Sequence, residues 1–250
     1  MVTGICRGHR SDGTPCLNTE LIKAHIVARG LADEIRGIHR HNWLISDHRV
    51  SHIQLGIWDD AILCATCDGK LGDLDNYALS VCRRFPTAHV VRRDGLFEMQ
   101  NVDGDKFATF VLSLLWRASI TTRLEFAKTA LGSYEDRARD VIFGVKPLSA
   151  LPEYELFVER YTPRGQFTGG YTMPARMTIG LTGWYFGLLG FRILAKLAPW
   201  SAAYRGEVVN GNDKLTGAFV DYEMTTEGQG AIAKARLEAT RAGVRARRIP

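Results

Sequence analysis

Two pairs of cysteines constrain the fold of this chain more than any other feature of its sequence. Cys64 and Cys67 enclose Ala-Thr, and Cys6 and Cys16 lie well upstream, across a Gly/Pro-containing turn that also holds His9. Two thiolates on a tight turn can hold one side of a tetrahedral Zn²⁺, and a second pair completes its shell. The spacing therefore predicts a structural Zn²⁺ site, with His9 as a substitute ligand; its four ligands are Cys6, Cys16, Cys64 and Cys67.

The alternative interpretation of these residues is a set of buried free thiols. The chain has five cysteines, an odd number, and its first residues, MVTGICRGHRSDG, lack the apolar core and small-residue cleavage site of a signal peptide. We therefore expect a cytoplasmic protein, in which metal binding is favoured over disulfides. Cys82, beside Arg83 on an expected helix, is predicted to be a packed thiol.

The composition is that of an ordinary globular protein. At 46% hydrophobic and 24% charged residues, the sequence excludes a disordered chain, a collagen-like fibre and a small disulfide scaffold. Its most apolar stretch, 181–199, is interrupted by Arg192 and Lys196. Because a bilayer span needs about 20 apolar residues, we expect this stretch to be core and expect no membrane contact.

The positive charge is concentrated at the C-terminus. Lys and Arg outnumber Asp and Glu by 32 to 27, and the last twenty residues hold six basic residues against one acid. A basic tail is typical either of a solvated, frayed helix or of a nucleic-acid contact. In the second interpretation the tail contacts phosphates through Arg245, Arg247 and Arg248.

The residue types divide the chain at Pro86. Residues 1–85 hold all five cysteines and all histidines but one, whereas 86–250 hold most of the aromatic residues. In the first part, apolar runs at 21–27 and 61–63 predict two strands, and spacings of three and four after Asp68 predict a helix. We therefore expect two domains in an α+β protein.

The second part is predicted to combine helices with an antiparallel sheet. Residues 105–118 have the apolar spacing of a helix, with Asp105 as its N-cap, and a second helix is expected at 133–143. From Tyr154 onward, apolar runs between Gly and Pro predict an antiparallel meander. A basic helix is expected at 227–247.

Taken in order, these features resemble the HNH endonuclease superfamily. The resemblance rests on Lys-Ala-His25-Ile-Val, on Ile-Leu-Cys64-Ala-Thr-Cys67-Asp68-Gly-Lys70 and on a later Leu-Ser-Leu-Leu-Trp-Arg117 run. It covers residues 6–82 in detail and extends loosely to about 140. It implies a zinc-stapled ββα-metal core, followed by the helix-plus-antiparallel-sheet domain, and a metal-dependent endonuclease acting on nucleic acid, with DNA expected. Standalone relatives of this kind are often associated with phage or defence.

The resemblance assigns roles to five residues. His25 stands at the position of the general base, and a neutral imidazole suits that role at cellular pH. Asp68 stands where the family binds its catalytic metal, here Mg²⁺ or Mn²⁺, and Asp75, seven residues later on the same helix face, is expected to assist. Asp59 takes the place of the residue that orients the active-site loop, and Lys70 is expected to contact a phosphate.

Departures from the family pattern leave alternatives open. Ala24 stands where the family usually supplies a second metal ligand, which favours a catalytically inactive zinc module that binds nucleic acid or a partner protein. Asp47-His48 is a second candidate for the base, although it lies close in sequence to the cysteine turn. His25 is also typical of a hydrogen-bonded core histidine, and Asp68 of a carboxylate that caps a helix N-terminus.

Overall fold

The fold is mixed α+β, as the sequence predicts. The computed structural model describes residues 4–36, 42–45, 50–53, 56–162, 171–177, 182–199, 207–225 and 229. The helices are α1 (Arg29–Arg36), α2 (Ala65–Ala88), α3 (Gly104–Ile120) and α4 (Glu135–Ile142). Short 3₁₀ turns cover Leu124–Phe126, Gly132–Tyr134, Leu148–Ala150 and Tyr222–Met224. No helix in these ranges is both long and apolar enough to cross a membrane.

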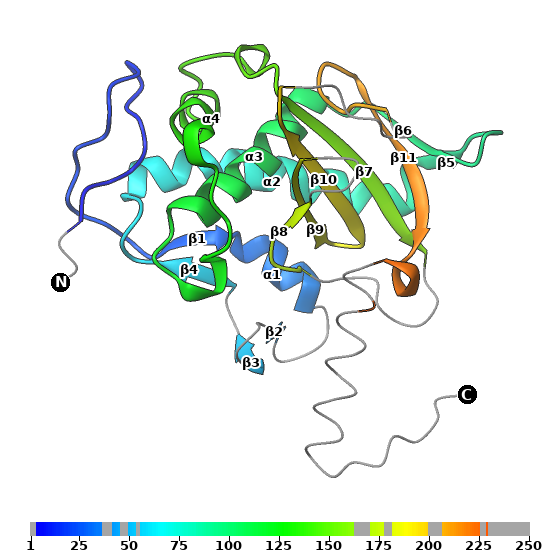
Figure 1. Ribbon diagram of the computed structural model, residues 1–250, viewed down its shortest axis with the longest axis horizontal. Helices are drawn as coiled ribbons and strands as arrows, with labels where there is room; N and C mark the ends of the chain where they lie inside the picture. The colour runs from blue at the N-terminus through cyan, green and yellow to red at the C-terminus, as the bar shows by residue number, and fades with distance from the viewer. Residues whose placement is uncertain are drawn as a thin grey trace, which may run out of the picture.

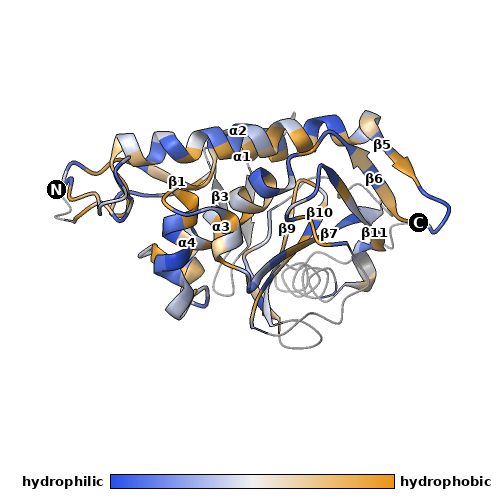
Figure 2. Cartoon of the chain, turned by 90° about the horizontal axis from the view of Figure 1, so that it is seen from above, coloured by the Kyte–Doolittle hydropathy of each residue, from blue (hydrophilic) through white to orange (hydrophobic). Residues whose placement is uncertain are grey.

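The first part of the chain builds two antiparallel strands and a long helix. β1 (Ala24–Val27) pairs with β4 (Ile57–Asp59), with a register irregularity between His25 and Val27, and α2 follows. Helix α1 and a separate hairpin of β2 (Asn42–Ile45) and β3 (Val50–Ile53) lie between these strands in the sequence. Figures 1 and 2 both show β1 and the large sheet at opposite ends of the molecule, with α2 running along its length.

The second strand lies earlier than the apolar run at 61–63 suggests. β4 ends at Asp59 because the Asp59 carboxylate accepts a hydrogen bond from the Ala61 amide at 2.8 Å, which turns the chain. After the turn, Cys64 forms only an isolated bridge with Leu21. The prediction of a strand at 61–63 is therefore wrong, although the order strand, strand, cysteine turn, helix is right.

Helix α2 continues through Pro86. Leu71, Ala78 and Val81 are buried, as their spacing predicts, but the helix ends only at Ala88. A proline in the last turn removes one hydrogen bond without ending the helix, and the His89 amide still donates to the Phe85 carbonyl. Phe85 also packs edge-on against Phe97 of the sheet, at 5.0 Å between ring centroids. The division at 85/86 stays a prediction, and contacts cross it.

The second part is a seven-stranded sheet in the order β5-β6-β11-β7-β10-β9-β8. Strands β7 to β10 are antiparallel, as predicted, with Leu189 and Gly190 both at positive φ in the tight turn between β9 and β10. Among the described strands, only β8, β9 and β10 form the predicted meander, because β7 pairs with β10 rather than with β8, the next strand of the sheet along the chain. The sheet is not antiparallel throughout, because β11 inserts between β6 and β7 and runs parallel to β7. The strands are β5 (His89–Val91), β6 (Phe97–Gln100), β7 (Tyr154–Thr162), β8 (Ala175–Met177), β9 (Gly183–Leu188), β10 (Phe191–Leu197) and β11 (Lys214–Asp221).

Helix α3 is the central core element, and its N-cap differs from the prediction. The Asp103 carboxylate accepts from the Lys106 amide at 2.9 Å and caps the helix, whereas Asp105 accepts from the Gly211 amide at 2.7 Å. Asp105 lies inside the first turn, so its side chain is free to hold the loop before β11. Helix α4 confirms most of the helix predicted at 133–143. The helix predicted at 227–247 lies, except for residue 229, outside the described residues.

Candidate functional site

Four cysteine side chains meet at the start of α2. Their sulfur atoms all lie within 4.8 Å of one another, all four residues are buried, and none forms a disulfide. The Cys16 and Cys64 sulfurs are 3.8 Å apart, and a tetrahedral site with Zn–S bonds of about 2.3 Å requires sulfurs about 3.8 Å apart. The cluster can therefore hold a metal ion such as zinc, and its ligands are those predicted: Cys6, Cys16, Cys64 and Cys67.

Local backbone geometry brings the two cysteine pairs together. The Cys64 amide donates to the Cys6 sulfur at 3.3 Å, and the Cys16 amide donates to the Gly8 carbonyl, closing the upstream loop. At Gly8 a Cβ atom would lie 2.7 Å from the Cys67 sulfur, so only glycine fits beside the cluster. The four cysteine side chains are therefore held close together by backbone hydrogen bonds and by close packing at Gly8.

His9 does not belong to the cluster. Its ring nitrogen Nε2 accepts from Arg139 at 2.7 Å and lies 3.2 Å from the Asp140 carboxylate on α4. The expectation of His9 as a substitute ligand is therefore not met. Its main-chain carbonyl accepts instead from the Lys70 ammonium at 3.3 Å. This contact places Lys70, the residue expected to contact a phosphate, against the loop between Cys6 and Cys16, which we call the cysteine loop.

His25 lies on β1, at the junction of β1, α2 and α3. It is directly opposite Trp58 of β4, and its side chain is half-buried. Its carbonyl accepts from the Arg117 guanidinium at 2.8 Å, and its backbone also hydrogen-bonds the Asp68 carboxylate. The residue predicted to be the base is therefore fixed through its main chain by both neighbouring helices.

Asp68 lies in the first turn of α2 near His25. Burial raises the pKa of its carboxyl, and the nearby positive charge of Arg117 and His25 opposes that shift. Among the described residues, no Lys, Arg or His nitrogen lies within 4.0 Å of this carboxylate as an ion pair. A partly desolvated carboxylate of this kind suits a hard divalent cation.

Asp75 is engaged in an ion pair. Both of its carboxylate oxygens accept from Arg117, at 2.7 and 3.0 Å, and the Arg117 side chain is only 1% exposed. Arg117 also donates to the Ser113 hydroxyl and to the His25 carbonyl. Asp75 lies on the helix face of Asp68, as predicted, but the guanidinium takes the oxygens that a metal would use.

Asp59 is saturated by hydrogen bonds. Its carboxylate accepts from the Thr121 hydroxyl, from the Thr122 amide and hydroxyl, and from the Ala61 amide. Burial raises the pKa of Asp59, but these hydrogen bonds outweigh burial, so the pKa lies below its usual value. These hydrogen bonds join the end of β4 to the residues that follow α3. Because Asp59 pairs with Ala24 of β1, it also helps to hold the strand that carries His25.

Of the remaining positions considered in the sequence, the structure describes only Ala24. Ala24 is fully buried, and its methyl side chain offers no atom that could bind a metal. His48 lies outside the described residues. The same holds for the basic tail: Arg245, Arg247 and Arg248.

Sequence reasoning missed Arg117 as the centre of the site. It is 0% exposed and contacts Asp75, Ser113 and His25 from α3. The signal in the sequence is the Leu-Ser-Leu-Leu-Trp-Arg117 run, in which an arginine follows a largely apolar stretch in the last turn of α3. A buried arginine requires a carboxylate partner, and Asp75 was the nearest candidate on the preceding helix.

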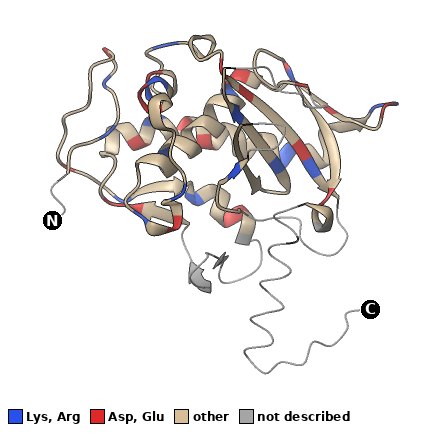
Figure 3. Ribbon diagram, viewed as in Figure 1, with Lys and Arg blue, Asp and Glu red and all other residues tan. Residues whose placement is uncertain are grey.

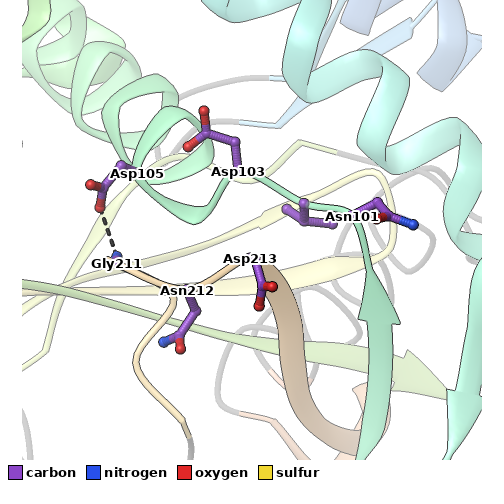
Figure 4. Close-up of a pocket in the computed structure, with 7 residues that line it drawn as sticks. Asn101, Asp103, Asp105, Gly211, Asn212 and Asp213 are labelled. Atoms are coloured by element: carbon purple, nitrogen blue, oxygen red, sulfur yellow. Dashed lines mark hydrogen bonds between the residues drawn. The ribbon is translucent and has the colours of Figure 1, made fainter.

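Two surface hollows lie away from His25 and Asp68. One, of about 380 Å³, borders the cysteine cluster at Cys16 and Cys64. The other, of about 410 Å³, lies at the N-terminus of α3, where Figure 4 shows Asp105 reaching the Gly211 amide. Since Asp103 and Asp105 are used to cap α3 and hold a loop, we assign this second hollow no role.

Comparisons with known proteins leave the chain without an assigned family. No protein-family model, no curated protein and no solved structure matches it. Its function must therefore be argued from its own residues.

Proposed function

We propose that this protein is a metal-dependent endonuclease of HNH type that hydrolyses phosphodiester bonds in nucleic acid. The observation that supports the proposal is the meeting of His25 on β1 with Asp68 on α2, next to a four-cysteine cluster. The order of β1, β4 and α2 resembles the ββα-metal core, with α1, β2 and β3 as an insertion.

In this proposal His25 is the general base. Its imidazole accepts a proton from the attacking water while its main chain stays fixed by Arg117 and Asp68. The Asp75–Arg117 pair positions His25, and Asp59 holds the neighbouring strand. These contacts hold the main chain of His25 in place.

Asp68 is the residue that would hold Mg²⁺ or Mn²⁺. When bound, such a cation supplies positive charge at the phosphate and at the leaving oxygen. Of the three candidate carboxylates, only Asp68 is neither ion-paired like Asp75 nor saturated like Asp59.

The test is cleavage of plasmid and single-stranded DNA or RNA with Mg²⁺ or Mn²⁺ by the zinc-loaded protein. His25→Ala is expected to lower the rate by at least about 10²-fold, the usual contribution of a general base. Asp68→Asn is expected to lower it as well, because it removes the carboxylate that would hold the cation. Asp73→Asn is the matched control, because Asp73 is exposed on the same helix. Equal cleavage by His25→Ala at unchanged zinc content would refute the assignment of the base.

A second candidate is a zinc module that binds nucleic acid or a partner protein without cutting. It is favoured by Ala24, whose buried methyl group replaces a metal ligand, and by the engagement of Asp59 and Asp75. Salt-sensitive binding without cleavage in any metal would support this candidate over the nuclease.

A further inference from the structure

The exposed face of β1 and β4 carries a lysine beside His25. His25 and Trp58 are direct cross-strand partners, so their side chains share one face of the two-stranded sheet. The Lys23 ammonium lies 4.6 Å from the centroid of the Trp58 ring. Lys23, Trp58 and His25 therefore form one contiguous surface, which we call the Lys23 face.

The charge of Lys23 is not neutralised by a described neighbour. Within the described ranges its contact is the Trp58 ring, whereas Lys146, Lys196 and Lys214 each pair with a carboxylate within 3.0 Å. An ammonium over an aromatic face keeps its full charge and its N–H donors. Lys23 is also exposed, so an anion from solution can reach it.

The end of β4, which carries the Trp58 ring under Lys23, is held by hydrogen bonds. The Arg123 guanidinium donates to the Trp58 carbonyl at 3.1 Å and pairs with Glu125. Asp59, the next residue of β4, is tied to Thr121 and Thr122. The main chain at Trp58 is thus fixed to the segment after α3. Because Trp58 is the cross-strand partner of His25, its ring and the ammonium over it lie on the side of the sheet that bears His25.

The other candidate lysine serves a different purpose. Lys70 donates to the His9 carbonyl of the cysteine loop and lies 5.9 Å from the centroid of the Phe143 ring. Figure 3 shows basic and acidic residues interspersed along the rest of the described ribbon.

We propose that Lys23, supported by the Trp58 ring, binds a phosphate of the nucleic-acid backbone and places the strand against His25. This inference rests on the proposed function and adds the residue that contacts the substrate backbone. The partner is the phosphate backbone of a nucleic acid, because a contact from lysine to a phosphate fixes the position of a strand without reading its sequence.

The test is binding of a fluorescein-labelled DNA duplex by the zinc-loaded full chain, followed by anisotropy over a salt series without added Mg²⁺ or Mn²⁺. Removing one phosphate contact is expected to lower the slope of log K against log[salt] by about 0.9. Lys23→Gln should show this loss, with several-fold weaker binding at low salt. Lys23→Arg should retain the slope.

Two further variants separate charge from position. Arg93→Gln removes one positive charge from an exposed residue of the β5–β6 turn and should leave the slope unchanged. Trp58→Leu should weaken binding at unchanged charge, whereas Trp58→Phe, which keeps an aromatic face, should restore most of it.

The outcomes distinguish this inference from the function on which it rests. If the unaltered protein cleaves DNA, and Lys23→Gln matches Arg93→Gln in slope and affinity, the Lys23 contact is refuted while the nuclease proposal stands. If the unaltered protein neither binds nor cleaves DNA or RNA, both fail together.

Discussion

Cys64→Ser is expected to abolish zinc binding and to unfold the region around β1, β4 and the start of α2. Cys64 is 1% exposed, its sulfur lies 3.8 Å from that of Cys16, and its amide donates to the Cys6 sulfur. Structural zinc contributes about 10–16 kcal/mol of apparent binding energy in small zinc modules. Because whole domains are stable by only about 5–15 kcal/mol, losing a contribution of this size is enough to unfold the region.

The measurements are zinc content by elemental analysis and thermal unfolding by circular dichroism. Cys82→Ala is the matched control, since Cys82 is a buried thiol outside the cluster. It should keep one zinc per chain and lose only about 1–2 kcal/mol, as expected for a small buried truncation. Retention of zinc and of the unfolding midpoint by Cys64→Ser would contradict the assignment of the four ligands.

Asp75→Asn is expected to destabilise the protein by about 3–5 kcal/mol, the usual cost of breaking one partner of a buried ion pair. The guanidinium of Arg117 is buried and would lose its charge partner while remaining unable to deprotonate. The same change loosens the hydrogen bond that fixes the His25 carbonyl.

Urea unfolding measures this effect, and a double-mutant cycle isolates it. Asp75→Leu combined with Arg117→Met should cost much less than the sum of the two single changes, because no unpaired charge remains. Asp73→Asn, on the exposed side of α2, should stay within about 0.5 kcal/mol of the unaltered protein. Additive single changes, or a loss below about 1 kcal/mol for Asp75→Asn, would contradict a coupled buried pair.

The features that sequence alone predicts are those set by local spacing. The cysteine cluster follows from a C-x-x-C turn and a second pair, because a metal site needs few, specific side chains. The apolar spacing likewise predicts α3 and the buried side of α2. The antiparallel pairing of β9 with β10 follows from the short turn between two apolar runs, whereas the pairing of β7 with β10 does not.

The features that sequence does not predict depend on partners far apart in the chain. Asp75 meets Arg117 across 42 residues, and Asp59 meets Thr121 and Thr122 across more than 60. These pairs determine which carboxylates remain available to bind a cation, and no local sequence pattern predicts them. The parallel pairing of β11 with β7 likewise depends on where the chain returns after β10.

The central proposal is that Mg²⁺ or Mn²⁺ binds at Asp68 beside His25, in addition to zinc at the four cysteines. Titration of the zinc-loaded protein with Mn²⁺ tests it directly. Electron paramagnetic resonance of free Mn²⁺ should show one bound ion per chain, absent in Asp68→Asn and retained in Asp73→Asn. Since burial raises the pKa of Asp68, binding should weaken as the pH falls through that raised value. No Mn²⁺ binding, or binding that survives in Asp68→Asn, would contradict the account.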